Sequence, residues 1–61
     1  MKYNVEKALK ALMGMLTPMY GAAVRNVVLE HVDEAGYWFK FELAQDSRRQ
    51  TWCVRHSDLE G

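Results

Sequence analysis

Apolar and polar side chains alternate with a two-residue period from Tyr37 to Leu43, the most regular pattern in the chain. The odd positions are apolar, and Trp38, Lys40 and Glu42 stand between them. This period is typical of a β-strand that buries one face and exposes the other. We therefore expect a strand here, with the other elements arranged against it.

Before residue 17 the apolar residues instead follow a helical period, recurring at steps of three and four. They are Val5, Leu9, Leu12, Met13 and Leu16. Asn4 precedes them, and asparagine commonly caps a helix N-terminus. The pattern predicts a helix over residues 4–16 with one apolar face.

The helical pattern is interrupted at Thr17 and Pro18. Proline lacks a backbone donor and disfavours helical geometry in the residue before it, so we expect the helix to be kinked or broken there. A short helical segment over residues 18–24 would restart with Thr17 as its cap and Pro18 at its first position.

The chain after the helix predicts an antiparallel meander of three strands. Half of residues 27–32 are β-branched, which is typical of a strand, and residues 33–36 are expected to form a turn. A second tight turn is expected at residues 46–47. The fold class predicted is α+β: a single small domain over residues 1–61 with the order α-β-β-β, in which the helix packs on the meander.

The register of the first hairpin depends on its loop. A three-residue loop that ends at a left-handed glycine places Leu29 opposite Phe41 and Glu30 opposite Lys40. A two-residue loop would place Glu30 against Phe39 and bury an unpaired carboxylate, so we favour the longer loop. The second hairpin is expected to pair Phe41 with Trp52, Phe39 with Val54, Trp38 with Arg55 and Lys40 with Cys53.

The two faces of the predicted sheet differ in character. The face under the helix holds Val27, Leu29, Phe39, Phe41, Leu43, Trp52 and Val54. The opposite face holds Val28, Glu30, Val32, Trp38, Lys40, Glu42, Thr51, Cys53 and Arg55. One helix cannot cover both faces, so the second face is expected to lie in solvent.

The small size of the chain bears on how it is stabilised. A domain of 61 residues buries only about 60% of the surface of its unfolded chain, and such scaffolds usually need a disulfide, a metal or a partner. Cys53 is the one cysteine, which excludes an internal disulfide and fits a cytoplasmic location. The histidines and Cys53 lack zinc-finger spacing, and no residue set predicts a cofactor. Self-association as a homodimer is therefore expected.

The formal net charge argues against a protein that binds nucleic acid mainly through electrostatic attraction. Eight basic and eight acidic residues give a formal net charge of zero. The first 26 residues are net basic and residues 27–46 are net acidic, a segregation more typical of docking between segments than of a polyanion site. The sequence shows neither the pattern of a secretory signal nor that of a membrane-spanning helix, so we expect neither feature.

The pairing of Trp38 with Arg55 marks the strongest candidate surface. Trp and Arg are enriched at the energetic centres of protein interfaces, and an exposed cation–π contact contributes roughly 0.5–1 kcal/mol. The residues predicted to bind a protein partner or a second copy are Val28, Val32, Trp38, Lys40, Cys53 and Arg55. The alternative is that this pair only shields its own sheet.

Two further functions remain open. An open sheet with an aromatic residue and cations resembles platforms that stack single-stranded bases. The residues for a nucleic-acid surface are Trp38, Lys40, Arg48, Arg49 and Arg55, with Glu30 and Glu42 on the same face opposing it. A third hypothesis is a structural subunit of a larger assembly.

Nothing in the sequence predicts an enzyme. Cys53 and His56 lie three residues apart, which directs them to opposite faces of a strand. No third group is placed to orient them, so a nucleophilic pair is not expected.

The first half of the chain contains Val5-Glu6-Lys7-Ala8-Leu9, Leu16, Pro18, Gly21-Ala22, and Val27, Leu29 and Val32. In these residues it resembles the opening of the NifU-type iron–sulphur scaffold domain. The resemblance implies a helix, a glycine-rich turn and then strands. The functional part of that family is a Cys-x-x-Cys pair, and with Cys53 alone no ligand position carries over.

Overall fold

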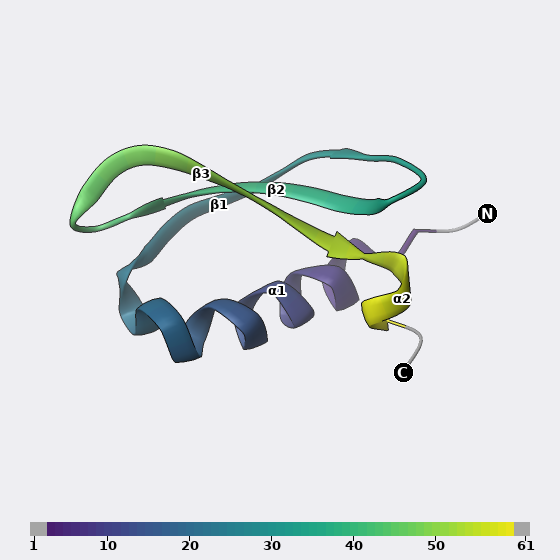
Figure 1. Ribbon diagram of the computed structural model, residues 1–61, viewed down its shortest axis with the longest axis horizontal. Coiled ribbons are helices and arrows are strands. Elements are labelled where there is room, and N and C mark those ends of the chain that lie inside the picture. Colours follow the sequence, from purple (N-terminus) through teal and green to yellow (C-terminus); the bar gives the residue numbers. More distant parts are fainter. Residues whose placement is uncertain (1–2, 60–61) are drawn as a thin grey trace.

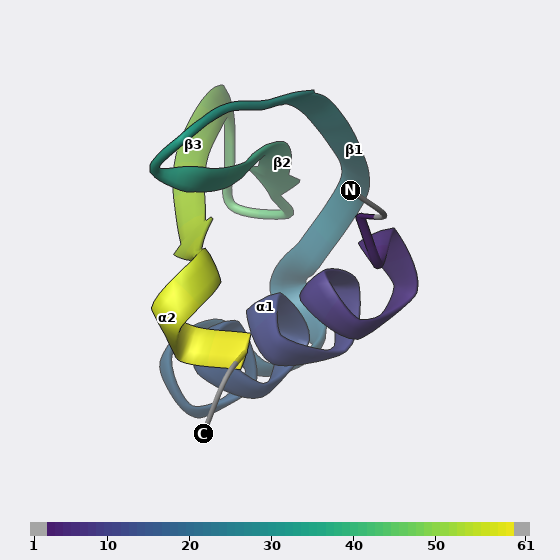
Figure 2. The ribbon, with the colours of Figure 1, turned by 90° about the vertical axis from the view of Figure 1, so that its right-hand side faces the viewer.

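A computed structural model describes residues 3–59. In chain order the elements are α1 (Val5–Tyr20), the 3₁₀ helix η1 (Gly21–Ala23), β1 (Val24–Val32), β2 (Gly36–Leu43), β3 (Asp46–Arg55) and α2 (His56–Leu59). The three strands form one sheet in the order β1-β2-β3, and both neighbouring pairs are antiparallel. Figures 1 and 2 show both helices on the same side of this sheet. The predicted α+β fold and its α-β-β-β order are confirmed.

The start of α1 is fixed by Asn4. Its side-chain oxygen accepts a hydrogen bond from the backbone N–H of Lys7 at 2.9 Å, as expected of an N-cap. Its own backbone N–H donates to the hydroxyl of Tyr37 on β2 at 2.8 Å. The cap therefore ties the first turn of the helix to the central strand.

The helix passes through Pro18 without a break and ends at Tyr20. Pro18 lies within one turn of this end, so its missing N–H removes a single intrahelical bond, the one to the carbonyl of Gly14. Gly14 is exposed, so water is near that carbonyl. The two helical segments that the sequence predicted around Thr17 are thus one helix, extended by η1.

The core lies between α1 and the sheet. Its fully buried residues are Ala8, Leu12, Leu16, Tyr37, Phe39, Phe41 and Val54. Every residue predicted for the covered sheet face either belongs to this cluster or packs against it. That part of the prediction is confirmed, and Tyr37, Val24 and Val32 join the same face.

The buried stripe of α1 is rotated relative to the predicted one. Ala8, Leu12 and Leu16 are buried, whereas Val5 is 40% and Leu9 38% exposed. Alanine has a small side chain, so the helix backbone can approach the sheet closely at Ala8. The larger Val5 and Leu9 lie at the margin of the contact.

The turn of the first hairpin is tighter than predicted. Val32 pairs with Tyr37, and the backbone N–H of Asp33 donates to the carbonyl of Gly36 at 3.0 Å. Gly36 has φ 157°, far from the left-handed helical value. Glycine is needed there for another reason: a Cβ would lie 2.2 Å from the carbonyl oxygen of Val54 on β3.

The predicted pairing of Leu29 with Phe41 is wrong, because Leu29 lies opposite Phe39. A β-bulge after Leu29 leaves Glu30 out of the ladder. Without it, the tight loop would place Glu30 against Phe39, which is the buried carboxylate that the prediction sought to avoid. The predicted ion pair is still present, with Lys40 Nζ 2.7 Å from Glu30 Oε2, although the two residues are not directly opposite.

A second irregularity in β1 surrounds Asn26. Asn26 has φ 55°, a left-handed conformation that asparagine tolerates better than most residues, and its amide donates to Glu42 Oε1. The strand begins at Val24, before the position predicted, and Val24 lies opposite Leu43.

The second hairpin turns at Ala44 and Gln45, not at residues 46–47 as predicted. The backbone N–H of Ala44 donates to the carbonyl of Ala23 at 2.8 Å, which holds this turn against η1. The register moves by two residues, so Phe39 pairs with Trp52. A shift of two preserves the face of every side chain, which is why the predicted faces of β2 and β3 survive.

Candidate interaction surface

No element within residues 3–59 covers the sheet face that is turned away from α1 (Figures 1 and 2). Two cross-strand rows build this surface: Val28, Lys40 and Thr51 form one, and His31, Trp38 and Cys53 form the other. Directly paired residues share a face, so the six side chains lie together. We call this surface the open face.

Five of the six predicted partner-binding residues lie on this side of the sheet: Val28, Trp38, Lys40 and Cys53 in the two rows, and Arg55 two residues beyond Cys53 on β3. Val32 does not, because the bulge at Glu30 reverses the alternation of β1 and packs Val32 against the core. The predicted pairing of Trp38 with Arg55 is also wrong. Arg55 lies opposite Gly36, and Trp38 lies opposite Cys53.

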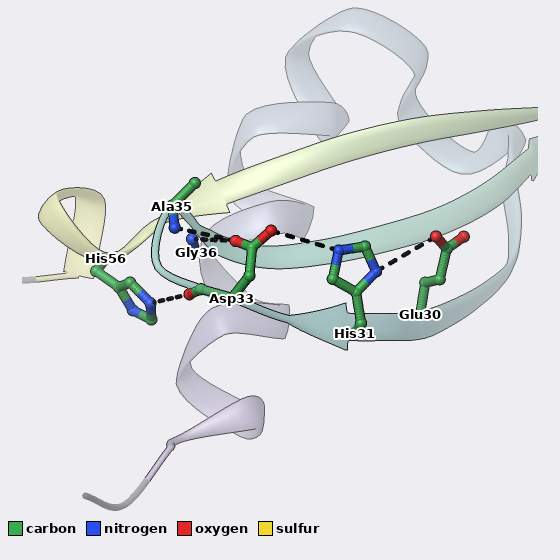
Figure 3. Close-up of polar contacts among 6 residues, drawn as sticks. All are labelled: Glu30, His31, Asp33, Ala35, Gly36 and His56. Carbon is green, nitrogen blue, oxygen red and sulfur yellow. Dashed lines mark hydrogen bonds and ion pairs between the residues drawn. The ribbon is translucent and has the colours of Figure 1, made fainter.

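On β1, His31 lies opposite Trp38 and takes the place on the open face that was expected for Val32. The two rings are stacked, with centroids 5.7 Å apart and an interplanar angle of 17°. His31 Nδ1 lies 3.3 Å from Glu30 Oε1, and His31 Nε2 lies 3.5 Å from Asp33 Oδ2. Figure 3 shows the imidazole between the two carboxylates. Sequence patterns did not identify His31 as a site residue, because no local pattern predicts the β-bulge that turns its side chain to this face.

The carboxylate of Asp33 organises the turn beside this ring. One oxygen accepts from the backbone N–H groups of Ala35 at 2.9 Å and Gly36 at 3.2 Å (Figure 3). The nearby indole N–H of Trp38, and then these backbone donors and His31, hold the pKa of the Asp33 carboxyl below its usual range. The indole nitrogen is itself buried and makes no hydrogen bond of standard geometry to a described residue.

Glu30 carries the second carboxylate of the open face. The hydrogen bond from Lys40 is the largest cause that lowers the pKa of the Glu30 carboxyl, and His31 contributes further. Both ion-pair partners are partly exposed, so solvent screens their attraction. The pair fixes side-chain positions around Val28, which is 49% exposed.

The thiol of Cys53 lies across the ladder from Trp38 and is partly buried. Burial, together with the negative charges of Asp33 and Asp58, raises the pKa of this thiol. A protonated thiol is a poor nucleophile and a poor metal ligand. On this surface Cys53 acts as a small apolar contact.

The arginines proposed for nucleic acid are spread along β3. Arg48 and Arg49 belong to the strand itself and not to the turn that precedes it. Arg49 lies opposite Glu42, with Nε 4.0 Å from Oε2. Glu42 is four residues from Trp38 along β2, a separation of about 13 Å. These cations therefore do not gather around the indole.

His56 docks α2 against the first hairpin. Its Nε2 donates to the carbonyl of Asp33 at 2.9 Å (Figure 3), and its backbone N–H donates to the carbonyl of Ala35 at 3.3 Å. The ring also packs edge-on to Tyr37, with centroids 5.3 Å apart. These contacts assign His56 to holding the turn, on the opposite side of Asp33 from His31.

Among residues 3–59, no group of three or more His, Cys, Asp or Glu side chains is arranged to hold a metal ion. In the same part of the chain, no helix is both long and apolar enough to cross a membrane. Comparison with protein-family models, with curated proteins and with solved structures found no significant match. The functional interpretation therefore rests on the geometry of the open face.

Proposed function

We propose that this chain is a small non-enzymatic interaction module that self-associates as a homodimer through the open face. One observation carries the proposal: a sheet covered on one side presents on its other side Val28, half exposed, beside a stacked His31–Trp38 pair. A cytoplasmic location belongs to the same proposal and is supported by the single cysteine.

The chemistry of the open face suits contact with a second copy. It combines the apolar Val28 and the aromatic Trp38 with the ion pair of Glu30 and Lys40. Protein interfaces commonly mix apolar and aromatic contacts with polar groups. A two-fold contact brings each surface against itself, and the near balance of acidic and basic groups around Val28 limits repulsion between copies.

Two alternatives are less well supported by the same contacts. A single-stranded nucleic acid would need a free indole face and free cations. His31 stacks on Trp38, and Lys40 and Arg49 each face a carboxylate. A structural role in a larger assembly would use the same open face with a different occupant.

Light scattering coupled to size-exclusion chromatography tests self-association. The wild-type chain is expected to elute with twice its monomer mass of 7.1 kDa. Val28→Glu places a charge within the proposed contact and should give a monomer. Val28 is half exposed, so this variant should remain folded.

Val5→Glu is the matched control. Val5 is 40% exposed on α1, on the other side of the molecule, and a carboxylate in the first helical turn is favourable. This variant should remain dimeric. A wild-type monomer at every concentration, or dissociation by Val5→Glu but not by Val28→Glu, would contradict the proposal.

A further inference from the structure

We propose that His31 is a proton-dependent cover over Trp38, closed when its imidazole is charged and open when it is neutral. The cover is an intramolecular device, so it does not depend on self-association. Its parts come from three places in the fold: His31 and Glu30 from β1, Asp33 from the turn, and Trp38 from β2.

Each ring nitrogen of His31 faces a carboxylate oxygen: Nδ1 lies 3.3 Å from Glu30 Oε1, and Nε2 lies 3.5 Å from Asp33 Oδ2. A charged imidazole donates from both nitrogens. A neutral imidazole has one donor and one lone pair, and that lone pair would face an anion. The observed arrangement therefore fits the charged ring and disfavours the neutral one.

The stack on Trp38 acts in the same direction. A cation over an indole face gains the attraction of the ring quadrupole, which a neutral imidazole does not. The rings are nearly parallel at 5.7 Å between centroids, a geometry in which this attraction operates. Loss of the proton thus weakens all three contacts of His31 at once.

The other charged and titratable groups near His31 keep their charge over the range in which histidine changes its own. Histidine side chains gain or lose their proton between about pH 5 and 8. Glu30 and Asp33 remain anionic there, because their neighbours hold both carboxyl pKa values low. Lys40 pairs with Glu30 from β2, and on β3 the pKa of the Cys53 thiol is raised. Arg55, opposite Gly36, is permanently charged.

Trp38 reports on the cover when it is the only tryptophan. The experiment uses the Trp52→Phe background, which retains an aromatic ring in the core, at a concentration where scattering shows a single oligomeric state. Acrylamide quenching of Trp38 fluorescence is measured at about pH 5 and about pH 8. The quencher should reach Trp38 more readily at the higher pH.

His31→Gln should abolish this pH dependence. His56→Gln is the control, because His56 contacts Tyr37 and the turn and not Trp38. It should retain the pH dependence. Circular dichroism verifies that both variants fold.

An NMR measurement on the unmutated chain covers the case in which a variant fails to fold. Cross-relaxation between the His31 ring protons and the Trp38 indole protons should be strong at the lower pH and lost at the higher. Equal quenching at both pH values, a pH dependence that survives His31→Gln, or a ring contact that persists at the higher pH would overturn the proposal.

Discussion

The two faces of the sheet are built from the same three strands but stabilised in different ways. On the covered face Phe39, Phe41 and Val54 are almost completely removed from water and pack on one stripe of α1. On the open face Lys40, Glu30 and His31 are held by ion pairs around the half-exposed Val28. The covered face depends on buried area, whereas the open face depends on charge and on the positions of single atoms.

This difference has an energetic consequence. Burying one large apolar side chain contributes about 1.5–3 kcal/mol, while an exposed ion pair contributes about 0–1 kcal/mol. The covered face therefore supplies most of the stability. The open face can change its side chains or its protonation at little cost to the fold.

The largest expected effect comes from the covered face. Phe39→Ala removes a ring that is 1% exposed and should lower the free energy of unfolding by about 3–5 kcal/mol. For a chain of this size that is comparable to the whole stability. Val28→Thr keeps a β-branched side chain on the open face and should change stability by less than about 0.5 kcal/mol. Urea denaturation followed by circular dichroism measures the free energy of unfolding of both variants. Equal decreases would contradict the proposed difference between the two faces.

A smaller effect is expected where β2 meets β3. Gly36→Ala places a Cβ 2.2 Å from the carbonyl oxygen of Val54, so backbone must move and stability should fall by about 1–3 kcal/mol. Gly14→Ala is the matched control, since nothing lies within 4 Å of its added Cβ. In the helix it should stabilise by about 0.5–1 kcal/mol. The melting temperature should fall in Gly36→Ala and rise in Gly14→Ala. A higher melting temperature in Gly36→Ala would contradict the close contact of Gly36 with the backbone of Val54.

The smallest effect is electrostatic and belongs to the open face. The folded state lowers the pKa of the Glu30 carboxyl, chiefly through the hydrogen bond from Lys40. A lowered pKa contributes stability that is present above the ordinary carboxyl pKa of about 4 and is lost as pH falls through the folded value. The melting temperature should therefore decrease on acidification, and less steeply in Glu30→Gln.

The acid measurement has a control in the turn that follows β1. Glu34→Gln removes an exposed carboxylate for which no ion pair occurs among residues 3–59. Its melting temperature should depend on pH as the wild type does. If Glu30→Gln and Glu34→Gln behave alike, the ion pair with Lys40 contributes nothing measurable.

The covered face was predictable because its signal is local and robust. The alternation around Phe39 and Phe41 assigned the strand and its buried side. The second turn was misplaced by two residues, but an even shift leaves every side chain on its face. The helix period located α1, though its buried stripe begins at Ala8, a residue too small to stand out by hydrophobicity.

The open face was predicted only in part, because β1 contains two bulges that no pattern in the sequence predicts. One of them exchanges the expected Val32 for His31 on the open face. It exists because the tight turn at Asp33 and the burial of Phe39 together leave no place in the ladder for Glu30. Such an adjustment arises from the whole hairpin and cannot be found from one strand.

Amide chemical shifts over a dilution series, from millimolar to micromolar, test the role of the open face most directly. The account predicts concentration-dependent shifts at Val28, Lys40 and the Trp38 indole N–H, with Lys10 on α1 unchanged. Val28→Glu should remove the dependence. Shifts that do not change with concentration, or that change only along α1, would contradict self-association through the open face.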